Sequence, residues 1–343
     1  MTANDFAPED PEGSDPGKEL ELYQRRFDMR HLIELYQRKQ ILGLPYELGV
    51  LPEAPPTQQT YLDLIEWGVL DNDGVLTPEA APQFEGLIDY QWASFGTILL
   101  FNERRPVKVD LPTEFFDYGY QHAIRDVPRV TFQIGVRNDH IVTAILNGGQ
   151  LQLSLDEAGH DLKSNCARVA DFLMKILDPS GEWEPYPMGV PSFVLPAGAI
   201  NTVLKDKELG PRPGDSEAAG TIATKIGEVM NAAGVESRTN RILDEMLRQE
   251  ELARVEICLV VRSAVGKRSR WNNAVGLTFL RGKDAQGAAV SYPFTAPDGA
   301  MWITWAPATR ETLATAIHAQ HVLLGEATAE ELFTPGKQRP DTI

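Results

Sequence analysis

The chain has 343 residues, of which 43% are hydrophobic and 8% aromatic, and its formal net charge at pH 7 is -17. This length and hydrophobic content suffice for one large globular domain or two of ordinary size. The acidic balance excludes nucleic acids and anionic membrane surfaces as partners, because binding to either requires concentrated cations.

Nothing in the sequence indicates a membrane or export segment. No apolar run approaches the roughly 18 residues that a membrane-spanning helix needs. The N-terminus has no basic start followed by an apolar stretch, so no signal peptide is visible. The two cysteines, Cys166 and Cys258, lie in apolar contexts, as buried thiols in a reducing compartment do. We therefore expect a cytoplasmic protein without membrane insertion.

The N-terminal part predicts an unordered arm followed by helices. Residues 1–19 hold six acids and three prolines, so they cannot bury enough apolar surface to fold and should form a disordered acidic arm. Helical periodicity runs from 20 to 42. Thr57 is placed to cap a second helix that ends at Gly68. After the tight turn at 71–74, Thr77-Pro78-Glu79 predicts the start of a third helix.

The next part predicts a sheet closed by a helix. Strands are expected at Trp92–Phe101, Val130–Val136, His140–Leu146 and Leu151–Leu155, because short apolar runs alternate there with Gly, Asn and Asp turns. An amphipathic helix over Asp161–Leu177 should close this part.

A long excursion, residues 102–128, separates the first two of these strands. Connections of this length in a compact domain are usually functional or disordered. This one carries four aromatic residues, Phe115, Phe116, Tyr118 and Tyr120. Because Tyr and Phe dominate interface hot spots, we predict that these four residues form a partner-binding site. The alternative is that they fold inward as additional core.

The C-terminal part predicts a second sheet-and-helix unit. A Pro/Gly-rich linker is expected at 178–215, followed by helices at Glu217–Ala233 and Arg238–Glu250. A sheet should begin near Leu252 and include Ala288–Phe294 and Met301–Trp305. A helix over Pro307–Leu324 should close it, and the polar tail 326–343 should fray.

The repeated order of short strands and closing helix suggests an internal duplication. The halves would be residues 20–177 and 216–325. We expect residues 92–177 and 252–324 to superpose as two copies. The predicted fold class is therefore α+β, with pseudo-two-fold duplicated units of mainly antiparallel sheet plus helix, and with additional helices.

No motif in the chain indicates a catalytic, cofactor or metal site. Gly266-Lys267-Arg268-Ser269 resembles the end of a P-loop, but Val261 stands where the upstream Gly is required. His318 and His321 have a metal-ligand spacing, yet no acidic third ligand follows until Glu326, so we interpret them as a surface or half-buried pair. We expect no enzyme activity, no cofactor and no metal.

One further group of charges has a structural interpretation. Four cations, Arg262, Lys267, Arg268 and Arg270, stand between two predicted strands of an acidic protein. A charged hairpin loop needs no function, and we favour that interpretation.

The order of three motifs along the chain resembles the EspG family of ESX (type VII) secretion-associated proteins. The residues that carry the resemblance are Gly43-Leu44-Pro45 with Leu48, the run Leu64–Glu79 with its Asp73-Gly74 turn and Thr77-Pro78, and Pro297–Ala308 before the last helix. It covers about residues 20–325. The acidic arm, the tail after Gly325 and the segment Val261–Trp271 depart from the family pattern.

The resemblance implies a quasi-two-fold α+β chaperone of the actinobacterial cytosol that binds PE–PPE heterodimers. Such a chaperone engages the PPE tip, shields its apolar end and keeps the pair soluble for an ESX system. The alternative function is a small-molecule-binding or enzymatic α+β protein with its site between the two halves. The sequence names neither the secreted partner, nor the ESX system, nor the oligomeric state.

Overall fold

The computed structural model describes most of the chain. It covers residues 27–49, 55–101, 105–106, 125–126, 128–147, 149–178, 181, 183–198, 216–262, 269–282 and 286–325. The helices are α1 (Met29–Gln37), the short 3-10 turn η3 (Tyr46–Leu48), α2 (Gln58–Glu66), α3 (Ala81–Ile88), α4 (Leu162–Leu177), α6 (Ser216–Ala232), α7 (Ser237–Leu247) and α8 (Arg310–Leu324).

The strands form one large sheet and one small one. Their bounds are β1 (Trp92–Leu100), β2 (Arg105–Pro106), β3 (Arg125–Asp126), β4 (Arg129–Arg137), β5 (His140–Asn147), β6 (Gln150–Glu157), β7 (Phe193–Pro196), β8 (Glu250–Arg262), β9 (Ser269–Arg281), β10 (Gln286–Thr295) and β11 (Met301–Pro307). Strands β2 and β3 pair only with each other, and the other nine form a sheet with the order β6-β5-β4-β1-β8-β9-β10-β11-β7.

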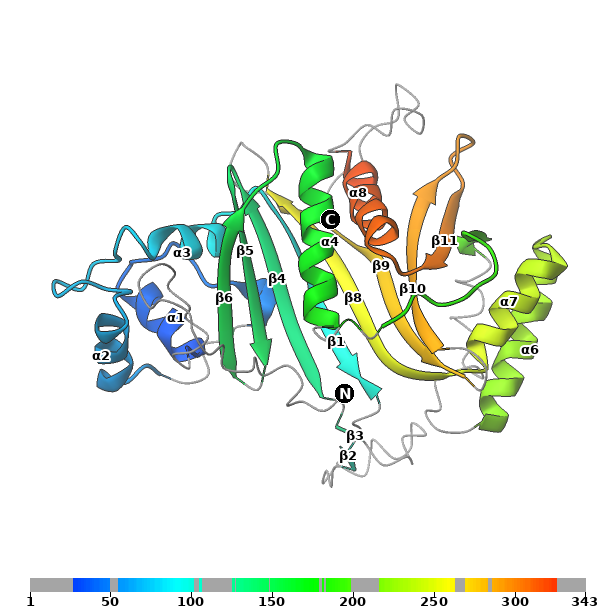
Figure 1. Cartoon of the computed structure of the whole chain (residues 1–343), viewed down its shortest axis with the longest axis horizontal. Coiled ribbons are helices and arrows are strands. Elements are labelled where there is room, and N and C mark those ends of the chain that lie inside the picture. The colour runs from blue at the N-terminus through cyan, green and yellow to red at the C-terminus, as the bar shows by residue number, and fades with distance from the viewer. Residues whose placement is uncertain are drawn as a thin grey trace, which may run out of the picture.

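The large sheet is antiparallel throughout and runs through both halves of the chain (Figure 1). Strands β1 and β8 pair near its centre. Counted from this pair outward, β1, β4, β5 and β6 follow in chain order on one side and β8, β9, β10 and β11 on the other, with β7 at the far edge; α4 follows β6 and α8 follows β11 in the chain. The mixed α+β class is confirmed. The strand order is the same in both halves, whereas the superposition of residues 92–177 on 252–324 stays a prediction.

One face of the sheet is covered by α4 and α8, which lie side by side across the central strands (Figure 1). Alternate residues of each strand point to this face because the side-chain period of a strand is two. In β1 these are Trp92, Ile98 and Leu100, which pack with Val169 and Leu173 of α4 in the largest apolar cluster. Across the two helices, the Arg310 guanidinium is hydrogen-bonded to the Asp171 carboxylate.

Two separate groups of helices cover the opposite face. Helices α1, α2 and α3 pack on β5 and β6, where Val142 and Leu151 join their apolar cluster. Helices α6 and α7 pack at the other end, where Leu280 of β9 and Ala289 of β10 meet Met246 of α7. The two groups lie at opposite ends of the sheet in Figure 1.

Glycines allow α3 to lie directly on the sheet. A Cβ atom at Gly135 of β4 would stand 2.4 Å from the carbonyl oxygen of Gly86, and one at Gly86 would stand 2.4 Å from a methyl carbon of Val142. Either distance is far below van der Waals contact. The N-terminal helical group therefore has a fixed distance from the sheet.

Helix starts follow the local sequence in most places. Thr57, Asp161 and Thr309 each occupy the N-cap position, and the side chain of each accepts a hydrogen bond from the amide three residues later. The predicted start at Thr77-Pro78-Glu79 was wrong by a few residues. Instead, the carbonyl oxygen of Thr77 accepts hydrogen bonds from the amides of Ala80 and Ala81 in a turn, and the helix begins at Ala81.

Two segments contain more strand than expected. The predicted linker 178–215 includes β7, whose Phe193 and Leu195 are buried against α7. Arg270, expected in a loop, lies in β9 opposite Val261. In the part of the chain that the structure describes, no helix combines the length and the apolar character needed to cross a membrane.

Candidate binding surface

The four aromatic residues predicted to bind a partner, Phe115, Phe116, Tyr118 and Tyr120, lie outside the described residues. The structure does show where their segment is attached. It leaves the sheet at the end of β1 and returns at β4, where the amide of Leu100 donates to the carbonyl oxygen of Pro128 at 3.0 Å. Their role as anchors stays a prediction.

A second candidate surface is the middle of the sheet on the face opposite α4 and α8. Here β1 and β8 lie between the two helical groups. The residues that alternate with those facing α4 and α8 must point to this opposite face. They include Phe95, Thr97, Leu99 and Cys258, all of which are half-buried. We call this surface the central strip and define it as residues 95, 97 and 99 of β1, 254, 256 and 258 of β8, and 276 and 278 of β9.

The register of the ladders places the strip residues in rows across the strands. One row runs from Thr97 to Glu256 and then to Gly276. The next runs from Arg129 of β4 through Leu99 and Arg254 to Thr278. Four of these seven residues are small or apolar, and the other three are Arg129, Arg254 and Glu256.

The turn η3 borders the strip. On the β4 side, the hydroxyl of Thr131 donates to the carbonyl oxygen of Leu48 in η3 at 3.1 Å. Tyr90 fastens the same turn, since its hydroxyl donates to the Glu47 carboxylate and the Arg262 guanidinium stacks 4.2 Å from its ring centre. Burial, with the nearby charge of Glu47, raises the pKa of the Tyr90 phenol well above its ordinary value, so the hydroxyl keeps its proton.

Charges on the strip are unevenly compensated. Arg254 is held by Glu251, whose two carboxylate oxygens accept from Nε at 2.7 Å and Nη2 at 2.8 Å. Glu256 is exposed and, among the described residues, has no hydrogen-bond or ion-pair partner. Its charge is felt by the neighbouring thiol. Burial, together with Glu256, raises the pKa of Cys258 to about 11, so this thiol is neutral and unreactive at pH 7.

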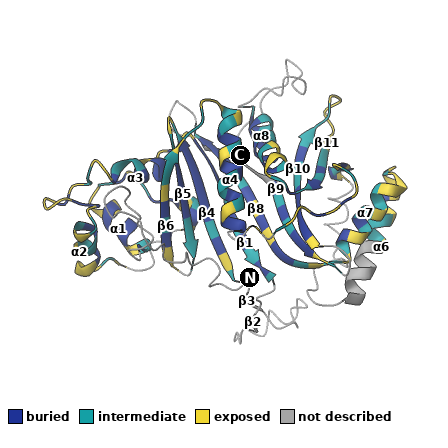
Figure 2. Cartoon of the chain, in the orientation of Figure 1, coloured by how far each residue is buried: buried dark blue, intermediate teal, exposed yellow. Residues whose placement is uncertain are grey.

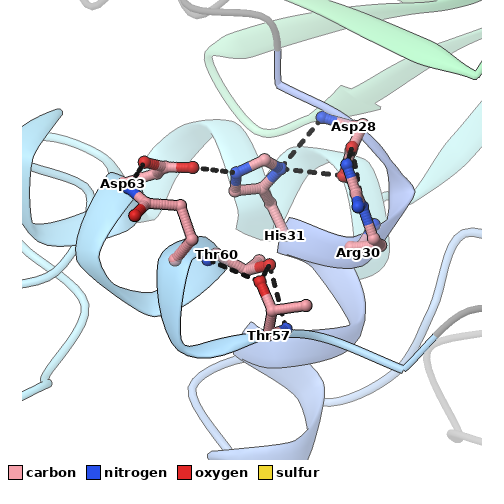
Figure 3. A network of polar contacts seen from close by, with 7 residues as sticks. Asp28, Arg30, His31, Thr57, Thr60 and Asp63 are labelled. Carbon is pink, nitrogen blue, oxygen red and sulfur yellow. Dashed lines mark hydrogen bonds and ion pairs between the residues drawn. The ribbon is translucent and has the colours of Figure 1, made fainter.

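Buried histidines are structural in this fold. Figure 3 shows His31 between Asp28 and Asp63, with its Nδ1 accepting the Asp28 amide at 3.1 Å and its Nε2 3.6 Å from Asp63 Oδ2. Its ring packs against Phe27 and Trp67 at centroid distances of 4.9 and 4.8 Å. The network ties α1 to α2. No local sequence pattern predicts this network.

The histidine pair of the last helix is divided by burial. His318 is half-buried, as expected, whereas His321 is fully buried against Trp92. A buried imidazole on an apolar ring has no room for a metal and its ligands. Within the described ranges, no group of three His, Cys, Asp or Glu residues is placed to hold a metal ion.

Of three pockets among the described residues, two lie within residues 20–177, and the third lies between β7 and the C-terminal half. A pocket of about 380 Å³ opens between β7, α7 and the turn before α7, and it is lined mainly by apolar residues such as Phe193, Ile242 and Trp302. None of the three lies between the two halves, where the alternative small-molecule site was expected.

Figure 2 shows the buried residues concentrated along the central strands, with exposed residues on α2 and α7.

Comparison with known proteins identifies a family. A sequence model of the EspG family matches residues 52–319. No protein with a curated description matches the chain. Among solved structures, the chain is similar to one from the structure of the Mycobacterium tuberculosis type VII secretion system chaperone EspG5 in complex with the PE25–PPE41 dimer. The sequence identity is 14%, the TM-score is 0.59, and the match covers 91% of this chain and 98% of that one.

Proposed function

The chain belongs to the EspG family, and from this premise we propose that it is a chaperone that binds a PE–PPE-type heterodimer for a type VII secretion system. The family match over most of the chain carries the proposal. Such a chaperone meets its substrate before export, so we place it in the cytoplasm. The net charge of -17 suits this role, because an acidic protein stays soluble while it holds an apolar partner.

We propose the central strip as the docking surface, together with the aromatic residues Phe115, Phe116, Tyr118 and Tyr120. Phe95 and Leu99 make the strip apolar, and both side chains remain partly exposed. The strands around it are fixed by ladders on both sides, so the surface is preorganised and little conformational entropy is lost on binding. The excursion that carries the aromatics starts at the end of β1, beside Leu99.

We also propose that the chain acts by binding alone. An enzyme needs a nucleophile or general base assembled with an orienting group at an accessible position. The buried histidines, His31 and His321, serve the packing of helices, and the half-buried thiol of Cys258 is protonated at pH 7. The family role needs only a surface.

The test is co-expression of the tagged chain with a panel of PE–PPE heterodimers. We expect the chain to retain at least one pair through size-exclusion chromatography as a stable complex. Thr97→Arg places a long charged side chain in the middle of the strip and should abolish retention. Because Thr97 is half exposed, the melting temperature should change little.

The matched control is Thr315→Arg on α8. Thr315 is exposed on the face of the sheet covered by α4 and α8, so this variant should retain the pair. Failure of the wild-type chain to retain any pair would contradict the chaperone function. Retention by Thr97→Arg at wild-type strength would leave the function standing but remove the strip as the docking surface.

A further inference from the structure

We propose that Glu256 of the central strip selects the partner by forming an ion pair with a basic side chain of the docked protein. We further propose that Arg129 fixes the orientation in which that protein docks. This inference rests on the proposed function and deepens it. It concerns two charges that have no compensating partner among the residues that the structure describes.

Glu256 stands alone in the middle of its row. Its neighbours across the strands are Thr97 and Gly276, which carry a short side chain and none. The cation two residues earlier, Arg254, is held by the bidentate contact with Glu251. The carboxylate of Glu256 therefore faces solvent with no compensating charge among the described residues.

Covering this carboxylate with an apolar partner would be unfavourable. A charge removed from water without a hydrogen-bond donor or a counter-charge loses its solvation without replacement. A partner that docks on the strip must therefore bring a Lys or Arg over β8, or leave the position hydrated. Charge complementarity of this kind discriminates between partners even where it adds little net affinity.

Arg129 is the second charge without a partner on this face. It is exposed in β4, opposite Leu99, and it forms no hydrogen bond or ion pair with the described residues. It lies two strands and two residues away from Glu256. With strand spacings near 4.8 Å and a rise near 3.4 Å per residue, the two Cα atoms are about 12 Å apart, and the structure shows no ion pair between the two side chains.

Together the two residues form a fixed pattern of opposite charges on a neutral surface. The expected partner carries a basic group that meets β8 and an acidic group that meets β4. A partner rotated by half a turn would place like charges together on both strands. The pattern therefore selects one orientation of the docked chain and not only one sign of charge.

The experiment uses the full chain and the PE–PPE pair that the wild type retains. Affinities are measured at low and high salt for Glu256→Gln, Glu256→Lys, Arg129→Glu and the double variant Glu256→Lys with Arg129→Glu. We expect a loss of about tenfold for each charge reversal, a smaller loss for the neutral variant, and a weaker salt dependence for Glu256→Gln.

The double variant shows whether affinity depends on the positions of the two charges or only on the net charge of the surface. It keeps the net charge of the strip, so it would recover wild-type affinity if only net charge mattered. We expect it to bind more weakly than either single reversal. Glu311→Lys, a charge reversal at an exposed position of α8, is the matched control and should bind as the wild type does.

Melting temperatures show whether each variant is folded. Wild-type affinity of both Glu256→Lys and Glu256→Gln would overturn the proposal while leaving the chaperone function intact. Recovery of affinity by the double variant would overturn the part that concerns orientation. A wild-type chain that retains no PE–PPE pair overturns both the proposed function and this inference.

Discussion

The imidazole of His321 meets the indole of Trp92 edge-on, with ring centroids 4.6 Å apart and ring planes at 87°. Trp92 begins the first strand of the large sheet, and His321 lies in the last helix, so the pair joins the two halves of the chain. Burial, with a contribution from nearby His318, lowers the pKa of His321 to about 3. The ring is therefore neutral in the folded protein at physiological pH.

This burial predicts acid sensitivity in a defined range. The unfolded chain binds a proton on His321 near pH 6.5, whereas the folded chain does not until about pH 3. The contribution to stability is therefore complete above pH 6.5 and falls as the pH drops below it. Between pH 7 and pH 5 the wild type should lose about 2 kcal/mol of unfolding free energy from this residue.

The measurement is denaturant unfolding of His321→Leu across the same pH range. Without the imidazole, this part of the pH dependence should disappear. His318→Gln is the matched control, since that ring is less buried and burial lowers its pKa as well; it should change the slope less. An unchanged slope in His321→Leu would show that other groups cause the acid sensitivity.

Gly96 should be irreplaceable for steric reasons. A Cβ atom there would stand 1.9 Å from the backbone oxygen of Glu256 and 2.9 Å from the Phe132 ring. The backbone atom cannot move without breaking the pairing of β1 with β8. We expect Gly96→Ala to lower stability by about 3 kcal/mol or more, measured by urea unfolding. Gly276→Ala meets only the Ser291 hydroxyl at 3.1 Å, which can rotate, so its cost should be small.

The predicted aromatic anchors can be separated from core residues by two measurements on one variant. Truncation of an interface anchor costs about 2 kcal/mol or more of binding, whereas truncation of a buried aromatic costs about 3–5 kcal/mol of folding stability. We expect Phe116→Ala and Tyr118→Ala to weaken binding of a co-expressed PE–PPE pair at an unchanged melting temperature. A large fall in melting temperature would assign these residues to the core.

The shared sheet predicts that neither half folds alone. Residues 1–180 would expose the whole edge of β1, and residues 181–343 the whole edge of β8, because these two strands pair with each other along β1. Exposed strands of this length aggregate. We expect each fragment alone to be insoluble and the co-expressed fragments to form a soluble complex. A monodisperse, folded single fragment would support two independent domains.

The elements that local chemistry specifies could be predicted from the sequence. Thr57 and Asp161 marked their helix starts because an N-cap is a local signal. Strand β7 was missed because its four residues lie in a Pro/Gly-rich segment, and its partner β11 is more than a hundred residues away. Pairing over such separations leaves no local pattern to recognise.

The central strip could not be predicted in this way. The alternation along β1 indicates two faces, but the strip exists because two groups of helices pack at opposite ends of one face. Glu256 appears in the sequence as one of many acids. Two features of the fold leave it isolated. The strand register places it between Thr97 and Gly276, and Arg254 is hydrogen-bonded to Glu251 instead.

The closure between Leu100 and Pro128 has a consequence for how such proteins diversify. An insertion or deletion within β1 would turn the residues beyond it to the opposite face of the sheet, so selection should remove it. A change of length between the two closing residues alters no register within the large sheet, because the hydrogen bond from Leu100 to Pro128 and the ladder of β1 with β4 stay the same. Descendants of one ancestor can therefore differ in length there while inheriting the same large sheet.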